Sequence, residues 1–136
     1  MAKVFKIEII ASDHIFYKGE CEMLVFPGTD GQHGILAGHE PMVTCLKPGE
    51  VKFLYNGEWQ FAAVSEGFVE ITPDHVILLA DTIENPDEID LRRAEQARMR
   101  AEERLHQKLS RQEYYYTLAS LNRAMTRLKV KKSHTK

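Results

Sequence analysis

The sequence has no long apolar run and very little cysteine. It contains neither a stretch of about 18 apolar residues nor a secretory apolar segment, so we expect no membrane-spanning helix and no export through a standard signal. Cys21 and Cys45 fit neither a CxxC motif nor a zinc-ligand spacing, and we expect two buried, reduced thiols of a cytosolic protein. Repeats and low-complexity segments are also lacking, apart from a basic tail from Lys129 onward.

Motifs of catalysis are missing as well. Five glycines lie between residues 28 and 49, but no Gly-x-x-x-x-Gly-Lys-Ser/Thr phosphate loop is present. His33 and His39 have no third ligand at a spacing that would support a metal. No Ser/His/Asp set, Cys/His set or carboxylate pair has a recognisable role. We therefore expect no catalytic residues, no metal site and no enzyme activity of the chain itself.

The chain changes character between Ile83 and Ala94. Apolar residues alternate with the period of a strand before this segment and recur with the period of a helix after it. Residues 1–87 carry 5 Lys+Arg against 14 Asp+Glu (5 − 14 = −9), and residues 88–136 carry 13 against 6 (13 − 6 = +7). The net charge of −2 thus conceals an acidic half and a basic half. We predict a domain over residues 1–85 and a helical hairpin with a basic tail over residues 86–136.

The start of the helical half has local signals of its own. Asn85 can cap a helix, Pro86 suits its first position, and Asp87 and Glu88 favour the positive end of the helix dipole. Asn85 and Glu88 also have the spacing of a capping box. These signals predict a helix that begins at Pro86.

Short strands fill the first domain. The first begins with Val4, Ile7 and Ile9 alternating with charged residues, and Phe5 is an irregularity in this alternation. A turn is predicted at Lys18-Gly19, followed by a second strand over residues 20–26 that ends at Pro27-Gly28.

Hairpins are indicated further along the first domain. Asn56-Gly57 between two apolar runs is a strong hairpin signal, because both turn positions need positive φ. Residues 68–72 and 75–80 form another pair around Pro73-Asp74, and the glycine-rich middle of the domain reads as tight turns around short strands. The pattern predicts a β-sandwich or flattened barrel, so the fold class is α+β by segregation, with the helical hairpin after the sandwich.

Two helices are predicted in the second half, each with an apolar stripe. Ser110 to Glu113 forms a second capping box, which starts the second helix. The stripe of the first helix is narrow and rich in alanine, and the stripe of the second has heptad spacing. The first stripe consists of Leu91, Ala94, Ala97, Ala101, Leu105 and Leu109, and the second of Tyr114, Leu118, Leu121, Met125 and Leu128. A short connection implies an antiparallel hairpin, either permanently packed or able to open.

Several segments together resemble a known family. They are Gly34–Thr44, Leu46–Gly49, Ser65–Ile71 and Leu78–Thr82. In order and length, almost the whole chain is similar to the epsilon subunit of bacterial F-type ATP synthases. This resemblance implies an N-terminal β-sandwich followed by a hairpin of two helices, which is also what the residues themselves predict.

A further resemblance concerns a regulatory ligand. Residues 89–94 match the Ile/Leu-Asp-x-x-Arg-Ala motif of epsilon subunits that bind ATP. In such subunits a preceding glutamate and arginines of both helices are associated with the nucleotide. By position, the implied ATP-binding residues are Glu84, Ile89, Asp90, Arg93, Ala94, Arg100, Arg123 and Arg127. Guanidinium groups suit phosphate oxygens, and Asp90 could orient Arg93 or accept from the adenine amino group or the ribose. Whether magnesium takes part is left open.

The same residues also fit an ordinary helical surface. Exposed arginine is common on helices, and Asp90 and Arg93 are spaced as an i,i+3 pair. On a helical wheel, Arg123 and Arg127 lie roughly 160° from the heptad stripe of the second helix. They would contact a nucleotide only if that stripe packs on the sandwich and the opposite face meets the first helix.

The resemblance implies a non-catalytic regulatory and coupling subunit, with ATP as its regulatory ligand. The sandwich would contact the gamma subunit and the ring of c subunits, at the cytoplasmic face of the bacterial membrane. The basic helices would extend toward the catalytic alpha/beta head and inhibit ATP hydrolysis.

A nucleic-acid-binding helical hairpin is the alternative, but its arginines alternate with acids and it offers few aromatic residues for stacking beyond Tyr114–Tyr116. A small-molecule enzyme would need convergent titratable groups, of which only scattered histidines are available.

Overall fold

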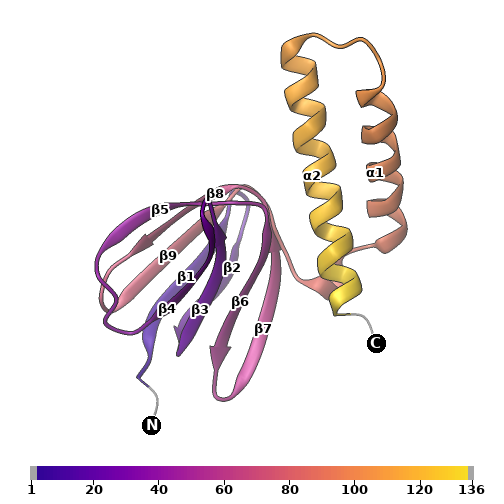
Figure 1. Cartoon of the computed structure of the whole chain (residues 1–136). Coiled ribbons are helices and arrows are strands. Elements are labelled where there is room, and N and C mark those ends of the chain that lie inside the picture. The colour runs from indigo at the N-terminus through magenta and orange to yellow at the C-terminus, as the bar shows by residue number, and fades with distance from the viewer. Residues whose placement is uncertain (1–2, 135–136) are drawn as a thin grey trace. The chain divides into compact units, whose positions relative to one another are not determined.

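The computed structural model of the chain describes residues 3–134 and divides into two compact units between Asn85 and Pro86. The first unit consists of strands and the second of helices (Figure 1). The division falls within the segment where the charge of the chain changes sign.

The first unit is a sandwich of two sheets, as predicted. In the described residues, ten strands form two five-stranded sheets. In spatial order, the first sheet consists of β2 (Ile15–Cys21), β1 (Phe5–Ala11), β9 (His75–Ala80), β8 (Gly67–Ile71) and β5 (Met42–Leu46). The second consists of β10 (Ile83–Glu84), β7 (Glu58–Val64), β6 (Gly49–Tyr55), β3 (Met23–Gly28) and β4 (Gly31–Leu36). Neighbouring strands are antiparallel except β1 and β9, which run parallel.

Alternating side chains of both sheets meet in one core between them. Its largest fully buried members are Ile7, Ile9, Leu24, Phe26, Ile35, Leu46, Val51, Phe53, Val69, Ile71, Val76 and Leu78. Phe5 belongs to this core at 3% exposure, whereas Val4 is 41% exposed. The expectation that Phe5 breaks the alternation was therefore wrong, because the alternation that faces the core begins at Phe5.

The predicted turn at Lys18-Gly19 does not form. Strand β2 runs through both residues, and Gly19 pairs with Ile7 of β1. A Cβ atom at Gly19 would lie 3.0 Å from the Tyr17 hydroxyl, so the glycine makes room for this ring. The chain bends at Glu22 instead, and β3 continues through Pro27 and Gly28 rather than ending before them.

Two local predictions for the sandwich were confirmed. Asn56 (φ 52°) and Gly57 (φ 76°) both have positive φ and join β6 to β7. Strands β8 and β9 pair around the turn at Pro73-Asp74, where the Thr72 amide donates to the His75 carbonyl over 2.8 Å.

The two cysteines differ, contrary to prediction. Cys21 is fully buried in the core, whereas Cys45 is exposed on β5. On this strand Leu46 is buried and Cys45 is not, because successive side chains of a strand point to opposite faces of its sheet.

The second unit contains a 3₁₀ turn and two helices, η1 (Pro86–Glu88), α1 (Leu91–Leu105) and α2 (Arg111–Ser133). The predicted start of the first helix at Pro86 was wrong. Pro86–Glu88 form the 3₁₀ turn η1, in which the Ile89 amide donates to the Pro86 carbonyl, and α1 begins only at Leu91. Asp90, not Asn85, caps α1: its side chain accepts from the Arg93 amide over 3.1 Å. No helix in residues 3–134 is long and apolar enough to span a bilayer.

The second capping box was confirmed in its first half. The Ser110 hydroxyl oxygen accepts from the Glu113 amide over 3.1 Å, and α2 begins at the next residue, Arg111. Helices α1 and α2 lie antiparallel and side by side (Figure 1). Of the basic tail, Lys129 to Ser133 belong to α2, whereas Thr135 and Lys136 lie outside the described residues.

The face of α2 that meets α1, which the sequence left open, is not the heptad stripe. Met125 is 51% exposed and Tyr114 is 44% exposed, whereas Thr117 and Ala124 are buried. The buried residues of α1 are two alanines, Ala94 and Ala101. Small side chains on both helices let α1 and α2 approach closely. The face of α2 that packs on α1 is therefore the one with Thr117 and Ala124, not the one with the largest apolar residues. Only Leu128 of the predicted stripe is buried.

Candidate functional site

A groove of about 790 Å³ runs between α1 and α2. Both helices contribute to its walls, and most of the lining side chains are either small or basic. The lining residues are Ala97, Arg100, Ala101, Arg104, Gln112, Glu113, Tyr116, Thr117, Ser120, Arg123, Ala124 and Arg127. The groove thus combines an apolar floor of alanines with polar and charged rims.

Positive charge dominates the groove. Four arginines line it, two from each helix, against a single carboxylate, Glu113. Arg100 and Arg104 are four residues apart on α1, as are Arg123 and Arg127 on α2, so each pair presents two like charges on one helix face. Like charges at this spacing are mutually destabilising, and an anion bound between the helices would relieve both pairs.

The arginines differ in their contacts within the protein. Arg104 Nη2 lies 3.3 Å from Glu113 Oε2 across the groove, and Arg123 Nη2 donates to Ser120 Oγ over 3.1 Å. Within residues 3–134, neither a hydrogen bond nor an ion pair engages the exposed Arg100 guanidinium. Most of the donor capacity of Arg100 is therefore directed to solvent.

Arg98 shows what an arginine of α1 does outside the groove. Its Nε donates to Glu95 over 2.9 Å and its Nη1 to Glu102 over 2.8 Å. The hydrogen bonds from Arg98 lower the pKa of the Glu95 carboxyl below its usual value. The charge of Arg98 is thus compensated along its own helix.

The structure brings three of the eight predicted ATP-binding residues together in the groove, namely Arg100, Arg123 and Arg127. For Arg123 and Arg127 to meet α1, the face opposite the heptad stripe has to face the first helix. The structure shows this orientation, since Arg123 and Arg127 line the groove together with residues of α1.

The other predicted residues lie elsewhere. Ile89 and Ala94 are buried at 4% exposure each, and Arg93 is exposed without lining the groove. The Asp90 carboxylate caps α1 by accepting from the Arg93 amide, and so has a structural role. Glu84 belongs to the sandwich unit, as the last residue of β10.

Six polar residues of the groove were not predicted from the sequence, namely Arg104, Gln112, Glu113, Tyr116, Thr117 and Ser120. Arg104 follows Arg100 at the i+4 spacing that keeps two residues on one helix face. Glu113, Tyr116 and Ser120 share a face with Arg123 and Arg127 by steps of three and four. The spacing of these residues in the sequence is therefore a signal that places them on one face of α2.

The histidines of the glycine-rich segment have local partners. His33 Nε2 lies 2.7 Å from Asp30 Oδ1, and its ring stacks on Phe26 with ring centroids 5.2 Å apart. The hydrogen bond from His33 lowers the pKa of the exposed Asp30 carboxyl. In the part of the chain that the structure describes, no cluster of three His, Cys, Asp or Glu side chains is placed to hold a metal ion.

Comparison with known families covers both units of the chain. The family described as ATP synthase, Delta/Epsilon chain, beta-sandwich domain matches residues 4–86. The family described as ATP synthase, Delta/Epsilon chain, long alpha-helix domain matches residues 87–132.

Similar proteins span nearly the same length. An ATP synthase epsilon chain of Ruminiclostridium cellulolyticum is 45% identical over 91% of this chain and 92% of its own length. One from Caldanaerobacter subterraneus subsp. tengcongensis is 41% identical, over 96% and 95%. One from Caldicellulosiruptor saccharolyticus is 40% identical, over 93% and 92%.

Solved structures share the fold at low sequence identity. A chain of the Euglena gracilis mitochondrial ATP synthase has a TM-score of 0.78 at 20% identity and covers 90% of this chain and 78% of its own length. A chain from the central stalk and c-ring structure of the Tetrahymena thermophila mitochondrial enzyme has a TM-score of 0.68 at 13% identity, over 98% of both. The family matches, the relatives and the fold agree over both units, and the family's members are stalk subunits rather than catalytic ones. The chain therefore belongs to the epsilon-chain family of ATP synthase.

Proposed function

We propose that this epsilon chain senses ATP through the groove between α1 and α2 and thereby regulates ATP hydrolysis by the synthase. The observation that carries the proposal is the set of four arginines, two from each helix, around one groove. A triphosphate held there contacts both helices at once. Such a ligand has a higher affinity for the closed hairpin than for the open form, and it shifts the equilibrium by that difference.

The lining of the groove suits both parts of a nucleotide. Its guanidinium groups suit the phosphates, and the alanines of its floor, Ala97, Ala101 and Ala124, offer an apolar surface to the adenine.

Without the nucleotide, the helices separate and extend. The basic helical half, with a net charge of +7 over residues 88–136, is attracted to an acidic surface of the catalytic alpha/beta head and inhibits hydrolysis there. The sandwich stays on the central stalk, against the gamma subunit and the c-ring. In this proposal the subunit is peripheral to the cytoplasmic face of the bacterial membrane.

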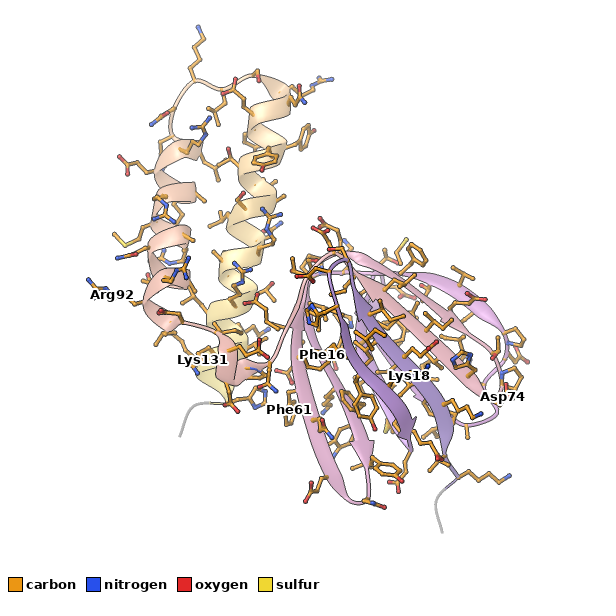
Figure 2. All side chains as sticks on the ribbon, turned by 180° about the vertical axis from the view of Figure 1, so that it is seen from behind. Phe16, Lys18, Phe61, Asp74, Arg92 and Lys131 are labelled. Carbon is orange, nitrogen blue, oxygen red and sulfur yellow. The ribbon has the colours of Figure 1, made fainter. Side chains whose placement is uncertain are left out.

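Calorimetric titration of the purified chain with ATP and ADP tests the site. We expect saturable binding that prefers ATP and that weakens by about tenfold or more in Arg123→Gln, because a charge-assisted hydrogen bond is lost. Arg92→Gln is the matched control, since Arg92 points away from the hairpin (Figure 2) and does not line the groove. Equal affinity in Arg123→Gln and Arg92→Gln would contradict the proposal.

A further inference from the structure

Glu113 is the only carboxylate among the residues that line the groove. Its position is fixed at the start of α2, where its amide donates to the Ser110 hydroxyl oxygen over 3.1 Å. In a complete capping box the glutamate side chain would turn back to the backbone of the capping residue. Here it instead crosses the groove and accepts from Arg104 over 3.3 Å.

The pair between Arg104 and Glu113 is easily exchanged. Both side chains are about half exposed, at 54% and 51%, and the ion pair is a single contact rather than a bidentate one. Exposed pairs of this kind add little to stability, whereas a guanidinium group binds phosphate in a charge-assisted, bidentate manner. A phosphate group that reaches Arg104 would therefore replace the Glu113 carboxylate as its partner.

We propose that Glu113 is a competing anion built into the groove, which occupies Arg104 until a polyphosphate displaces it. The inference rests on the proposed nucleotide site and concerns its regulation. Glu113 raises the ATP concentration at which the groove fills, because it holds one of the four arginines and repels the incoming phosphates. Arg104 is then the phosphate-binding residue that the carboxylate controls.

The variant Glu113→Gln tests this role directly. Glutamine is also favoured at this position of a capping box, so the start of α2 is preserved. We expect ATP to bind about threefold to tenfold more tightly by calorimetry, in line with the modest strength of one exposed charge pair. The gain should be smaller for ADP, which carries less charge, and should shrink at high ionic strength because salt screens the repulsion.

Two further variants separate local competition from general electrostatics. Glu103→Gln removes the same charge one residue from Arg104, but Glu103 is exposed and does not line the groove. It should leave ATP affinity within about twofold, since an exposed charge facing solvent is screened. Arg104→Gln should weaken ATP binding about threefold to tenfold, and adding Glu113→Gln to it should give a smaller gain than Glu113→Gln alone.

The possible results bear differently on the two proposals. If ATP binds the unmodified chain and Arg123→Gln weakens that binding, but Glu113→Gln behaves like Glu103→Gln, the inference about Glu113 is overturned and the nucleotide site stands. A gain of equal size for ATP and ADP would also overturn it, because competition for charge must depend on ligand charge. Absence of ATP binding in every variant, Glu113→Gln included, would overturn both.

Discussion

At the scale of single residues, the two thiols of the chain differ in burial and therefore in reactivity. Burial of Cys21 in the sandwich core raises the pKa of its thiol to about 12, because a thiolate in an apolar environment is poorly solvated. The thiolate is the reactive form, so Cys21 is unreactive in the folded chain both for lack of access and for lack of charge. Cys45 is exposed on β5.

We expect one thiol per chain to react with a disulfide reagent such as DTNB in native buffer at mildly alkaline pH. The second should react only in denaturant. Cys45→Ser should abolish the fast reaction and leave the slow one. Raising the pH by one unit should not make Cys21 react, since the pKa of its thiol lies far above the pH of the assay. A fast reaction of folded Cys45→Ser would contradict the burial of Cys21.

At the scale of the strands, the absence of a side chain at one glycine allows two strands to pair closely. Gly67 pairs with Ala80 where β8 meets β9. A Cβ atom at Gly67 would overlap the Leu79 carbonyl oxygen and lie 2.8 Å from Ala80 Cα. Both obstacles are backbone atoms of the neighbouring strand, so the added methyl group cannot be accommodated by rotating a side chain.

Gly67→Ala should therefore lower the free energy of unfolding of the sandwich by about 3 kcal/mol. Gly34→Ala is the matched control in a strand, because the added Cβ would meet only the mobile end of the Met23 side chain, at 3.1 Å. That variant should change the free energy by less than about 1 kcal/mol. Urea unfolding followed by fluorescence of Trp59, the single tryptophan of the chain, measures both. Similar values for the two variants would refute the argument.

The elements that the sequence predicted correctly are those with local causes. Asn56-Gly57 forms its turn because both residues tolerate positive φ, and Ser110 caps α2 through a bond three residues away. The failures depend on distant neighbours. Gly19 lies within a strand because Tyr17 covers it. The sequence left open which face of α2 meets α1, and this face is set by the alanines of the facing helix, which favour Thr117 and Ala124.

In the candidate site, too, single residues could be predicted from the sequence, whereas a contact between the two helices could not. Arg100, Arg123 and Arg127 were assigned by their position in the family resemblance, and they lie together in the groove. The contact between Arg104 and Glu113 joins residues on two helices, and its geometry depends on how those helices pack. No local pattern could have predicted it.

At the scale of the whole molecule, the proposed switch can be locked. Arg104 and Glu113 are nine residues apart and meet across the hairpin, whereas in one continuous helix they would be separated by about 13 Å. A short reducible cross-linker between cysteines at these two positions, in a Cys45→Ser background, should therefore hold the hairpin closed.

Assembled into ATP synthase, the cross-linked chain should not inhibit ATP hydrolysis, and reduction of the linker should restore inhibition. The same complex before and after reduction is its own control, because the substitutions are identical in both states. Equal inhibition in the two states would show that extension of the helices is not required.

The small side chains between the helices have a consequence for the proposed switch. Ala101, Thr117 and Ala124 bury little apolar surface compared with leucine or phenylalanine, so the closed hairpin is held by a small margin. A single larger side chain at one of these positions would push the helices apart without touching an arginine. In the proposed switch, the balance between the closed and the open hairpin can thus be changed through these spacing residues alone, while the arginines of the groove are kept.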